Sequence, residues 1–192
     1  SCGLHLTGGV ALAGTRERMD FLKMQHATGR VLGMETELIT AEEAHKLMPL
    51  LDPKHFVGAL YDPVEGHLDP SGTTHAYAKA ARINGAEIYL RNRVVELTQN
   101  ADATWNVVTE EGTIQAEHVV NAGGLWAREV GRMVGLELPV LAMEHMYLLT
   151  EDMPEVKAVN DDTGQEVIHA IDFEAELYLR QERGGMLMGT YE

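Results

Sequence analysis

Apolar residues recur along this chain at the two spacings that distinguish helices from strands. Spacings of three and four residues follow Thr15, Thr40 and Asp69, and they predict a helix after each of these positions. The side-chain oxygen of each can accept a hydrogen bond from a free N–H at the helix start, as an N-cap does. A fourth helix is expected over residues 125–135, with Trp126 and other apolar side chains pointing inward.

Alternating or continuous apolar runs predict strands throughout the chain. The candidates are residues 3–14, 56–61, 87–90, 94–97, 105–109, 113–116, 118–122, 140–150, 166–170, 177–180 and 186–188. Helix and strand patterns mix between residues 70 and 137, and sheet-forming segments flank that stretch on both sides. The pattern indicates an α+β fold with two lobes, between which the chain passes more than once.

Acidic residues outnumber basic residues by 30 to 15, which gives a formal net charge of -15. A charge of this sign repels nucleic-acid phosphates and anionic lipid headgroups, so we expect no nucleic-acid partner. No apolar run approaches the roughly 20 residues that a membrane-spanning helix needs, so no membrane partner is expected either.

Cysteine and histidine usage argues against disulfides and metals. The single cysteine, Cys2, excludes an intrachain disulfide and a cysteine-based metal cluster. The nine histidines show no pair at metal-ligand spacing such as HExxH, so no metal site is predicted. The chain starts at Ser1 without an initiator Met, which indicates that the complete polypeptide begins upstream. It shows no targeting signal, neither a signal-peptide core nor an Arg-rich transit pattern.

One short run combines an apolar strand pattern, two glycines and a helix pattern without a break: VVNAGGLWA, residues 119–127. Glycines let a backbone approach a ligand closely, and free N–H groups at a helix start favour an anion such as a pyrophosphate. A plain tight turn between a strand and a helix explains the same residues. A cofactor contact and a turn therefore both remain open at this point.

The longer segment around these glycines, VVNAGGLWAREVGRMVGLELP, is similar to the second flavin-contacting segment of the FAD-dependent D-amino-acid oxidase superfamily. The similarity is to its dimethylglycine and sarcosine dehydrogenase branch. Two further runs resemble the same branch in the same order, LMPLLDPKHFVGALYDPVEGHLDP and ELYLRQERGGMLMGTYE. Because the resemblance spans nearly all 192 residues, the chain is identified as an internal piece of a member of this branch.

The resemblance implies a mixed or antiparallel substrate-domain sheet together with part of an FAD-binding, glutathione-reductase-like α/β domain. Residues 1–68 and 139–192 would belong to the substrate domain, and residues 69–138 to the FAD-binding domain. No GxGxxG motif follows an early strand, so the N-terminal dinucleotide-binding unit of the family is missing. We therefore expect FAD in the complete protein, but neither tight FAD retention nor activity in this chain alone.

The resemblance places five residues beside the cofactor: Val94, Asn121, Ala122, Gly123 and Trp126. Val94 would contact the adenine side through its backbone, although a valine that begins a strand is ordinarily a core residue. His67, in the run GHLDP, would lie near the flavin because the corresponding loop of the family does. Capping of the next helix by Asp69 also explains that run.

Two strand candidates carry the residues expected to meet the substrate. Alternation puts Tyr178 and Arg180 on one face of their strand, so a polar pair could line a pocket. In the family a histidine and a tyrosine stand beside the substrate amine, and these match His145 and Tyr178. Arg180 could clamp a substrate carboxylate in a two-pronged pair, or it could form a surface ion pair.

The resemblance implies an oxidoreductase that oxidises the N-methyl group of dimethylglycine, sarcosine or a similar amino acid, with hydride passing to FAD. His145 would take the ammonium proton and Tyr178 would orient the substrate. The alternatives are an amine oxidase of the glycine oxidase type that uses oxygen, and a non-catalytic module that binds a small amine. The branch often passes the one-carbon unit to tetrahydrofolate, and its members would act in the bacterial cytoplasm or the mitochondrial matrix.

Overall fold

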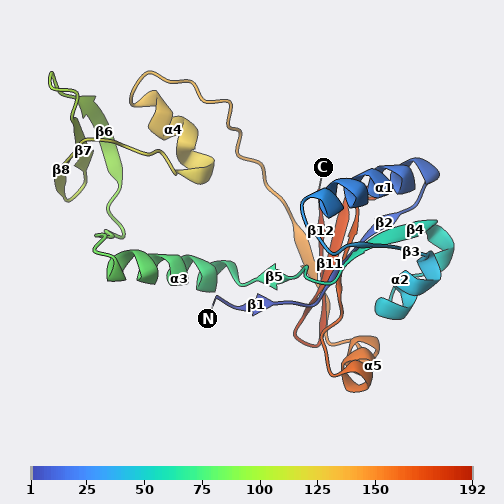
Figure 1. The fold of residues 1–192 in the computed structure, drawn as a ribbon. Coiled ribbons are helices and arrows are strands. Elements are labelled where there is room, and N and C mark those ends of the chain that lie inside the picture. Colours follow the sequence, from blue (N-terminus) through green and yellow to red (C-terminus); the bar gives the residue numbers. More distant parts are fainter. Residues whose placement is uncertain (1, 192) are drawn as a thin grey trace. The chain divides into compact units, whose positions relative to one another are not determined.

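The structure is a computed structural model that describes residues 2–191 (Figure 1). The chain divides into two compact units. The larger unit joins Ser1–Tyr77 to His145–Glu192, and the smaller unit is Ala78–Glu144. The sequence predicts that residues 1–68 and 139–192 form a substrate domain and that residues 69–138 belong to a cofactor domain. That assignment of roles stays a prediction.

A seven-stranded sheet forms the centre of the larger unit, in the order β3–β4–β2–β10–β11–β12–β9 (Figure 1). Its strands are β2 (Gly9–Ala13), β3 (Glu37–Ile39), β4 (Gly58–Asp62), β9 (Tyr147–Leu149), β10 (His169–Asp172), β11 (Leu177–Glu182) and β12 (Gly185–Thr190). β2 and β10 run parallel, and every other neighbouring pair in this sheet is antiparallel. The expected α+β class with a mixed sheet is therefore confirmed.

Local capping chemistry starts two helices of the larger unit. The Thr15 hydroxyl accepts a hydrogen bond from a backbone N–H of the first turn at 3.2 Å, and Thr40 forms a complete capping box with Glu43. These helices are α1 (Arg16–Val31) and α2 (Ala41–Leu47), and the 3-10 turn η1 (Pro53–His55) follows them. A further helix, α5 (Pro154–Thr163), has no side-chain cap at its N-terminus, and the sequence pattern does not predict it.

The two faces of the seven-stranded sheet are covered differently. On one face, which we call the core face, Val10 and Leu12 are buried against residues of α2 and α5. The buried cluster comprises Val10, Leu12, Ala44, Met48, Leu51, Ala59, Val156, Val167, Ile168, Ala170 and Met186. The opposite face carries Gly9 and Ala11, and α1 packs over it at β2 and β4. We call this second face the α1 face.

A two-stranded ladder of β1 (Leu4–His5) and β5 (His67–Leu68) precedes α3 (Pro70–Ile83). The Asp69 carboxylate caps α3 by accepting hydrogen bonds from two backbone N–H groups of the first turn, at 3.0 and 2.9 Å. This confirms the helix start that the sequence predicts at Asp69. No helix among the described residues is both long and apolar enough to cross a membrane.

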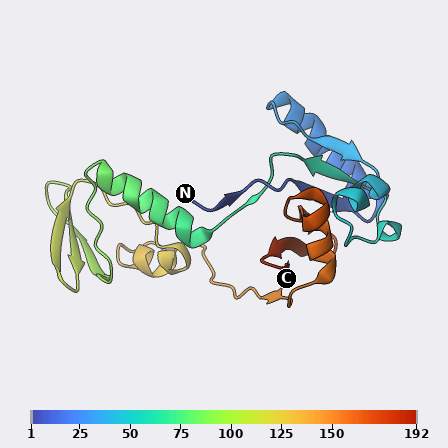
Figure 2. The same cartoon turned by 90° about the horizontal axis from the view of Figure 1, so that it is seen from below.

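Three antiparallel strands form the sheet of the smaller unit, in the order β6–β7–β8 (Figure 2). They are β6 (Val94–Gln99), β7 (Trp105–Thr109) and β8 (Gly112–Ala116), and they are followed by η2 (Gly124–Trp126) and α4 (Ala127–Arg132). The three strands lie where the sequence predicts them, because alternation and the turn at Glu111 and Gly112 are local signals.

Other expected strands are absent or shorter. Residues 118–122 form no ladder, and Val120 is 87% exposed. An apolar segment becomes a strand only beside a partner, and the described residues provide none there. The strand expected at 87–90 is absent as well, and the one expected over 140–150 is confined to β9.

The helix expected over residues 125–135 is interrupted. It splits into the 3-10 turn η2 and the six-residue helix α4. Gly135 adopts a left-handed conformation with φ of 77°, which is the usual way for a glycine to end a helix. The prediction that Trp126 points inward is wrong, because this side chain is 64% exposed. A helix this short also carries little of the dipole on which the pyrophosphate argument depends.

Candidate active site

Tyr178 lies on the α1 face, in the middle of the seven-stranded sheet. It stands opposite Ile171 of β10 and Gly189 of β12. Gly189 leaves room for the tyrosine ring, because a Cβ at this position would overlap the ring atoms of Tyr178. The next residue along the strand, Leu179, packs against the buried cluster on the core face. The alternation predicted for this strand is therefore confirmed for these two residues.

Four rings of the larger unit contact one another in succession, and we call them the aromatic row. The ring centroid of Tyr178 lies 6.4 Å from that of His169 and 5.5 Å from that of Tyr191. Tyr191 in turn lies 5.4 Å from the ring of His145, in an edge-to-face arrangement. The structure thus brings His145 and Tyr178 into one row with a single ring between them. Their contact with substrate stays a prediction.

A carboxylate–imidazole pair stands at the other end of the row. Glu65 Oε1 lies 2.9 Å from His169 Nδ1, and the two side chains are 31% and 16% exposed. Neither His169 nor Glu65 stands out in the sequence as a site residue. The alternating run around His169 places it on the face opposite Ala170, but no sequence pattern shows that β10 lies beside Gly9 and β11.

Arg180 follows Tyr178 by two residues, and its guanidinium forms an ion pair. Its Nη1 donates to the Glu182 carboxylate at 2.7 Å and to the carbonyl of Gln181 at 3.0 Å. Of the two roles considered for Arg180, the structure therefore shows the surface ion pair, here with Glu182. The clamp stays a prediction, and it requires the guanidinium to leave Glu182.

His67 is the partly buried member of a stacked histidine pair. Its ring lies 4.7 Å from that of His5, with an angle of 11° between the planes, and its Nδ1 is buried without a hydrogen-bond partner. Burial lowers the pKa of His67, and the nearby Arg180 and His5 lower it further. The neutral form is therefore favoured. A position of His67 beside the flavin stays a prediction.

Three potential metal ligands converge here despite their separation in sequence. One ligand atom from each of His5, His67 and Glu166 lies within 4.8 Å of the others. Arg180 and Arg183 line the same cavity of about 240 Å³, and their positive charge disfavours a divalent cation. The expectation of no metal site stays a prediction, and sequence spacing could not have revealed this cluster.

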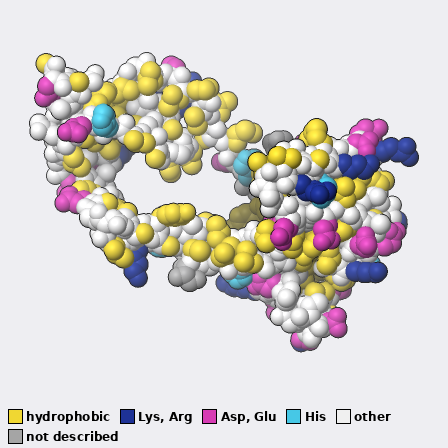
Figure 3. Space-filling model, in the orientation of Figure 1, with side chains coloured by type: hydrophobic (Ala, Val, Ile, Leu, Met, Phe, Trp, Pro, Cys, Tyr) yellow, Lys and Arg dark blue, Asp and Glu magenta, His cyan; other side chains and the backbone are white. Residues whose placement is uncertain are grey.

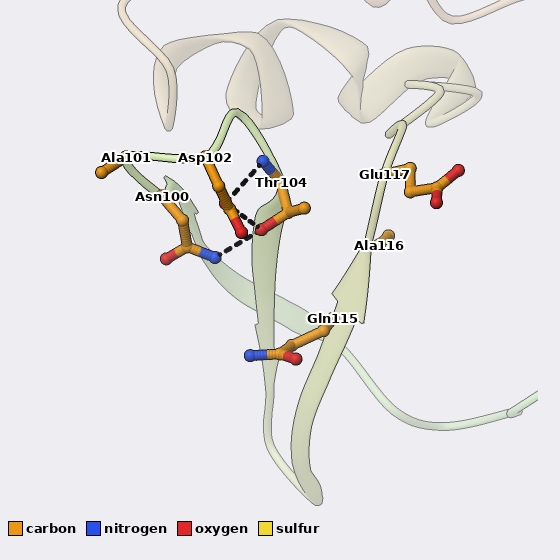
Figure 4. A pocket seen from close by; sticks show the side chains of 7 residues that line it. All are labelled: Asn100, Ala101, Asp102, Thr104, Gln115, Ala116 and Glu117. Atoms are coloured by element: carbon orange, nitrogen blue, oxygen red, sulfur yellow. Dashed lines mark hydrogen bonds between the residues drawn. The ribbon is translucent and has the colours of Figure 1, made fainter.

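A surface depression of about 550 Å³ lies at the β6–β7 hairpin of the smaller unit (Figure 4). The Asp102 carboxylate accepts hydrogen bonds from the Thr104 backbone N–H at 3.1 Å and from its hydroxyl at 2.6 Å. These bonds lower the pKa of Asp102. The Asn100 amide donates to the Thr104 hydroxyl at 3.0 Å. The polar groups thus stabilise a hairpin turn, and we assign this depression no chemistry.

The glycine-containing turn of the smaller unit is held by its own asparagine. The Asn121 amide donates to the carbonyl of Ala127 at 2.8 Å, and its oxygen accepts from the backbone N–H of Gly123 at 3.1 Å. Gly124 has φ of 57°, a conformation that favours glycine. The side chain of Asn121 is therefore occupied, so any cofactor contact there would come through the backbone of Asn121, Ala122 or Gly123.

Apolar side chains are exposed around that turn, and Figure 3 shows hydrophobic atoms gathered over α4 and the loop after it. The exposed apolar residues include Val119, Val120, Leu125, Trp126, Leu136 and Leu141. Val94, half-buried, begins β6 opposite Thr109, next to a bulge in the ladder. An apolar surface of this kind is typical of a contact with another molecule or another part of a protein.

The chain is similar in sequence to two known dehydrogenases. It is 40% identical over 190 residues to mitochondrial dimethylglycine dehydrogenase from Rattus norvegicus. The aligned region covers 99% of this chain and 22% of that protein. It is 33% identical over 199 residues to mitochondrial sarcosine dehydrogenase from Homo sapiens, and this alignment covers 99% of this chain and 21% of that protein. The chain thus spans about a fifth of the length of these relatives.

The crystal structure of L-proline dehydrogenase from P. horikoshii has a similar fold. It matches with a TM-score of 0.82 and 27% identity over 97% of this chain and 49% of that chain. The family model described as FAD dependent oxidoreductase (DAO) matches residues 1–192. Because this match covers the whole sequence, the chain belongs to the FAD dependent oxidoreductase family.

Proposed function

We propose that the protein to which this chain belongs oxidises the N-methyl group of a small amino acid, dimethylglycine or sarcosine. The observation that carries the proposal is the aromatic row with a carboxylate beside it, in a chain 40% identical to a dimethylglycine dehydrogenase. Aromatic ring faces attract methylated ammonium groups, and the Glu65 carboxylate supplies a negative charge. Such a surface suits a methylated amine better than an anion.

The smaller unit has features that fit FAD. Its glycine turn is held in place by a side chain and lets the backbone approach a ligand closely, and the exposed apolar groups around it suit a flat ring. The residues proposed to hold FAD are Val94, Asn121, Ala122, Gly123 and Trp126, with His67 near the flavin. FAD, when bound, accepts the hydride that leaves the N-methyl carbon.

The residues of the larger unit would prepare the substrate. A methylated amine carries a proton at neutral pH, and hydride loss requires the free lone pair of its nitrogen. His145, at the exposed end of the aromatic row, takes that proton on a ring nitrogen. Tyr178 orients the amine through its hydroxyl. Arg180 holds the substrate carboxylate once it exchanges Glu182 for it.

The proposal extends to partners and compartment. Tetrahydrofolate would capture the one-carbon unit after oxidation. The mitochondrial matrix, or the cytoplasm of a bacterium, is the proposed compartment, and the two relatives compared above are both described as mitochondrial.

The test is the visible spectrum of the full-length protein before and after anaerobic addition of dimethylglycine. The flavin band should bleach, and His145→Ala and Tyr178→Phe should each slow the bleaching by at least about tenfold, the scale of a lost proton-transfer or orienting group. Tyr77→Phe, at an exposed tyrosine of α3, is the matched control and should bleach at the wild-type rate.

The outcomes separate the candidate functions. A flavin band that neither dimethylglycine nor sarcosine bleaches rules out the demethylase proposal. Rapid oxygen consumption during turnover supports the amine oxidase alternative instead. A protein that binds dimethylglycine by calorimetry but holds no flavin supports the non-catalytic module.

A further inference from the structure

We propose that Glu65, held in place by His169, recognises the positive charge of the substrate amine. This inference rests on the proposed function and adds two residues to it. It assigns them a role in specificity, as positioning groups at the end of the aromatic row.

Glu65 is fixed in position by three contacts on the α1 face. Its backbone carbonyl accepts a hydrogen bond from the Gly8 N–H at 2.8 Å, which closes the loop after β4. Its carboxylate lies over Gly9, where a Cβ would collide with it, so the absence of a side chain at residue 9 makes room for it. The third contact is the 2.9 Å bond to His169, which stands beside Gly9 in the parallel β2–β10 pair.

The cavity beside this carboxylate is lined by acidic and apolar side chains. Glu65 and Asp62 border this cavity of about 420 Å³ between α1 and the sheet. Apolar residues such as Ala11, Met24 and Leu60 line most of the rest of it. This lining includes two carboxylates and no Lys or Arg, and its other side chains are mostly apolar. A cavity with these properties attracts an alkylated cation and repels an anion.

His169 links Glu65 to the aromatic row. One ring nitrogen is bonded to Glu65, and the ring meets Tyr178 edge to face. A methylated ammonium group resting against His169 would have the Tyr178 ring on one side and the Glu65 carboxylate on the other. Both interactions favour a positive charge, and neither depends on a free N–H of the ligand.

The competing explanation is that Glu65 only anchors its loop through His169. In that case the negative charge would be incidental, and a glutamine would serve equally well. The two explanations differ in their effect on charged and uncharged ligands. A structural role predicts equal loss for both, and a recognition role predicts loss for the cation alone.

The experiment compares two ligands that share a carboxylate and a similar size. Trimethylglycine carries a permanent positive charge and has no lone pair to oxidise, and 3,3-dimethylbutanoate has an uncharged carbon in place of the nitrogen. Dissociation constants are measured on the full-length, FAD-loaded protein from the change that each ligand causes in the flavin spectrum. We expect the wild type to bind trimethylglycine about tenfold more tightly, the scale of one partly desolvated ionic contact.

Three variants complete the test. Glu65→Gln keeps a hydrogen bond to His169 and should abolish the preference for the cation, leaving the two dissociation constants within about threefold. Glu65→Asp keeps the charge and should retain the preference. Glu42→Gln, which removes a charge from an exposed position of α2, is the control and should behave as the wild type.

The inference is overturned if the wild type shows no preference, a result that needs no variant to fold, or if Glu65→Gln keeps the preference. It is distinguishable from the proposed function because binding is measured without turnover. A protein that prefers the cation through Glu65 but is not bleached by dimethylglycine supports the recognition site and contradicts the demethylase. A protein that dimethylglycine bleaches but that shows no preference for the cation supports the demethylase and contradicts the recognition site.

Discussion

Substitution of Gly189 by alanine should displace Tyr178 from its place on the α1 face. Gly189 does not have a positive φ, so alanine fits the backbone, and the effect comes from the added methyl group alone. That methyl would overlap Tyr178 Cζ, Cε1 and Oη. Either the tyrosine ring turns away or β12 moves.

The size of the effect follows from two opposing terms. Overpacking of this kind costs about 1–3 kcal/mol. Replacing a strand glycine by alanine returns about 0.4–1 kcal/mol, because the unfolded chain has fewer conformations to lose. Gly189→Ala should therefore lower the free energy of unfolding by about 1–2 kcal/mol. In a Tyr178→Ala background the overlap is gone, and the same change should be neutral or stabilising.

The assay is a double-mutant cycle by urea unfolding. The midpoint should fall for Gly189→Ala at unchanged slope, and the coupling energy between positions 189 and 178 should be about 2 kcal/mol. Thr190→Ala, at the exposed neighbouring position, is the control and should stay within about 0.5 kcal/mol of the wild type. An equal cost of Gly189→Ala with and without the tyrosine ring would refute the reasoning.

Two further predictions concern buried polar groups of the larger unit. Gln181 is buried, and it accepts hydrogen bonds from the Val167 N–H at 2.7 Å and from the Asn160 amide at 3.0 Å. Gln181→Met should therefore cost about 2–3 kcal/mol in urea unfolding, because it leaves the Val167 N–H and one N–H of the Asn160 amide unpaired. A loss below about 0.5 kcal/mol would mean that water or a neighbour replaces these bonds. Burial, and then Arg180, hold the pKa of His67 below its ordinary 6.5, so the unfolded chain takes up a proton that the folded chain does not. The stability that His67 contributes above about pH 6.5 should therefore be lost as the pH falls below that value. His67→Gln should reduce this loss, measured as urea midpoints between pH 8 and pH 5.5. Identical pH dependence in the variant and the wild type would contradict the prediction.

Local chemistry is the part of this fold that the sequence reveals. The N-caps at Thr15, Thr40 and Asp69 are each set by one side chain and the next few backbone N–H groups, so they can be predicted from neighbouring residues. The helix α5 shows the limit of this signal. Its N-cap is Met153, which has no oxygen to offer, and the helix is missed.

Pairing between distant segments is the part that the sequence leaves open. Residues 118–122 have the composition of a strand, but a strand also requires a neighbour, and the described residues supply none. The same limit applies to the site. Alternation correctly separates Tyr178 from Leu179, yet nothing local shows that β10 and its His169 lie beside β11, or that Glu65 reaches over β2.

The glycines of the α1 face connect the fold to the proposed chemistry. At Gly9 the carboxylate of Glu65 lies over the bare backbone of β2, and at Gly189 the ring of Tyr178 lies over β12. In both places a strand without a side chain makes room for a functional group that comes from elsewhere, while the opposite face keeps the buried cluster. Because the two faces are separate, an added side chain at either glycine should displace a functional group and leave the core intact. A glycine in a strand ordinarily weakens packing, because it has no side chain. At positions 9 and 189 the proposed site requires one.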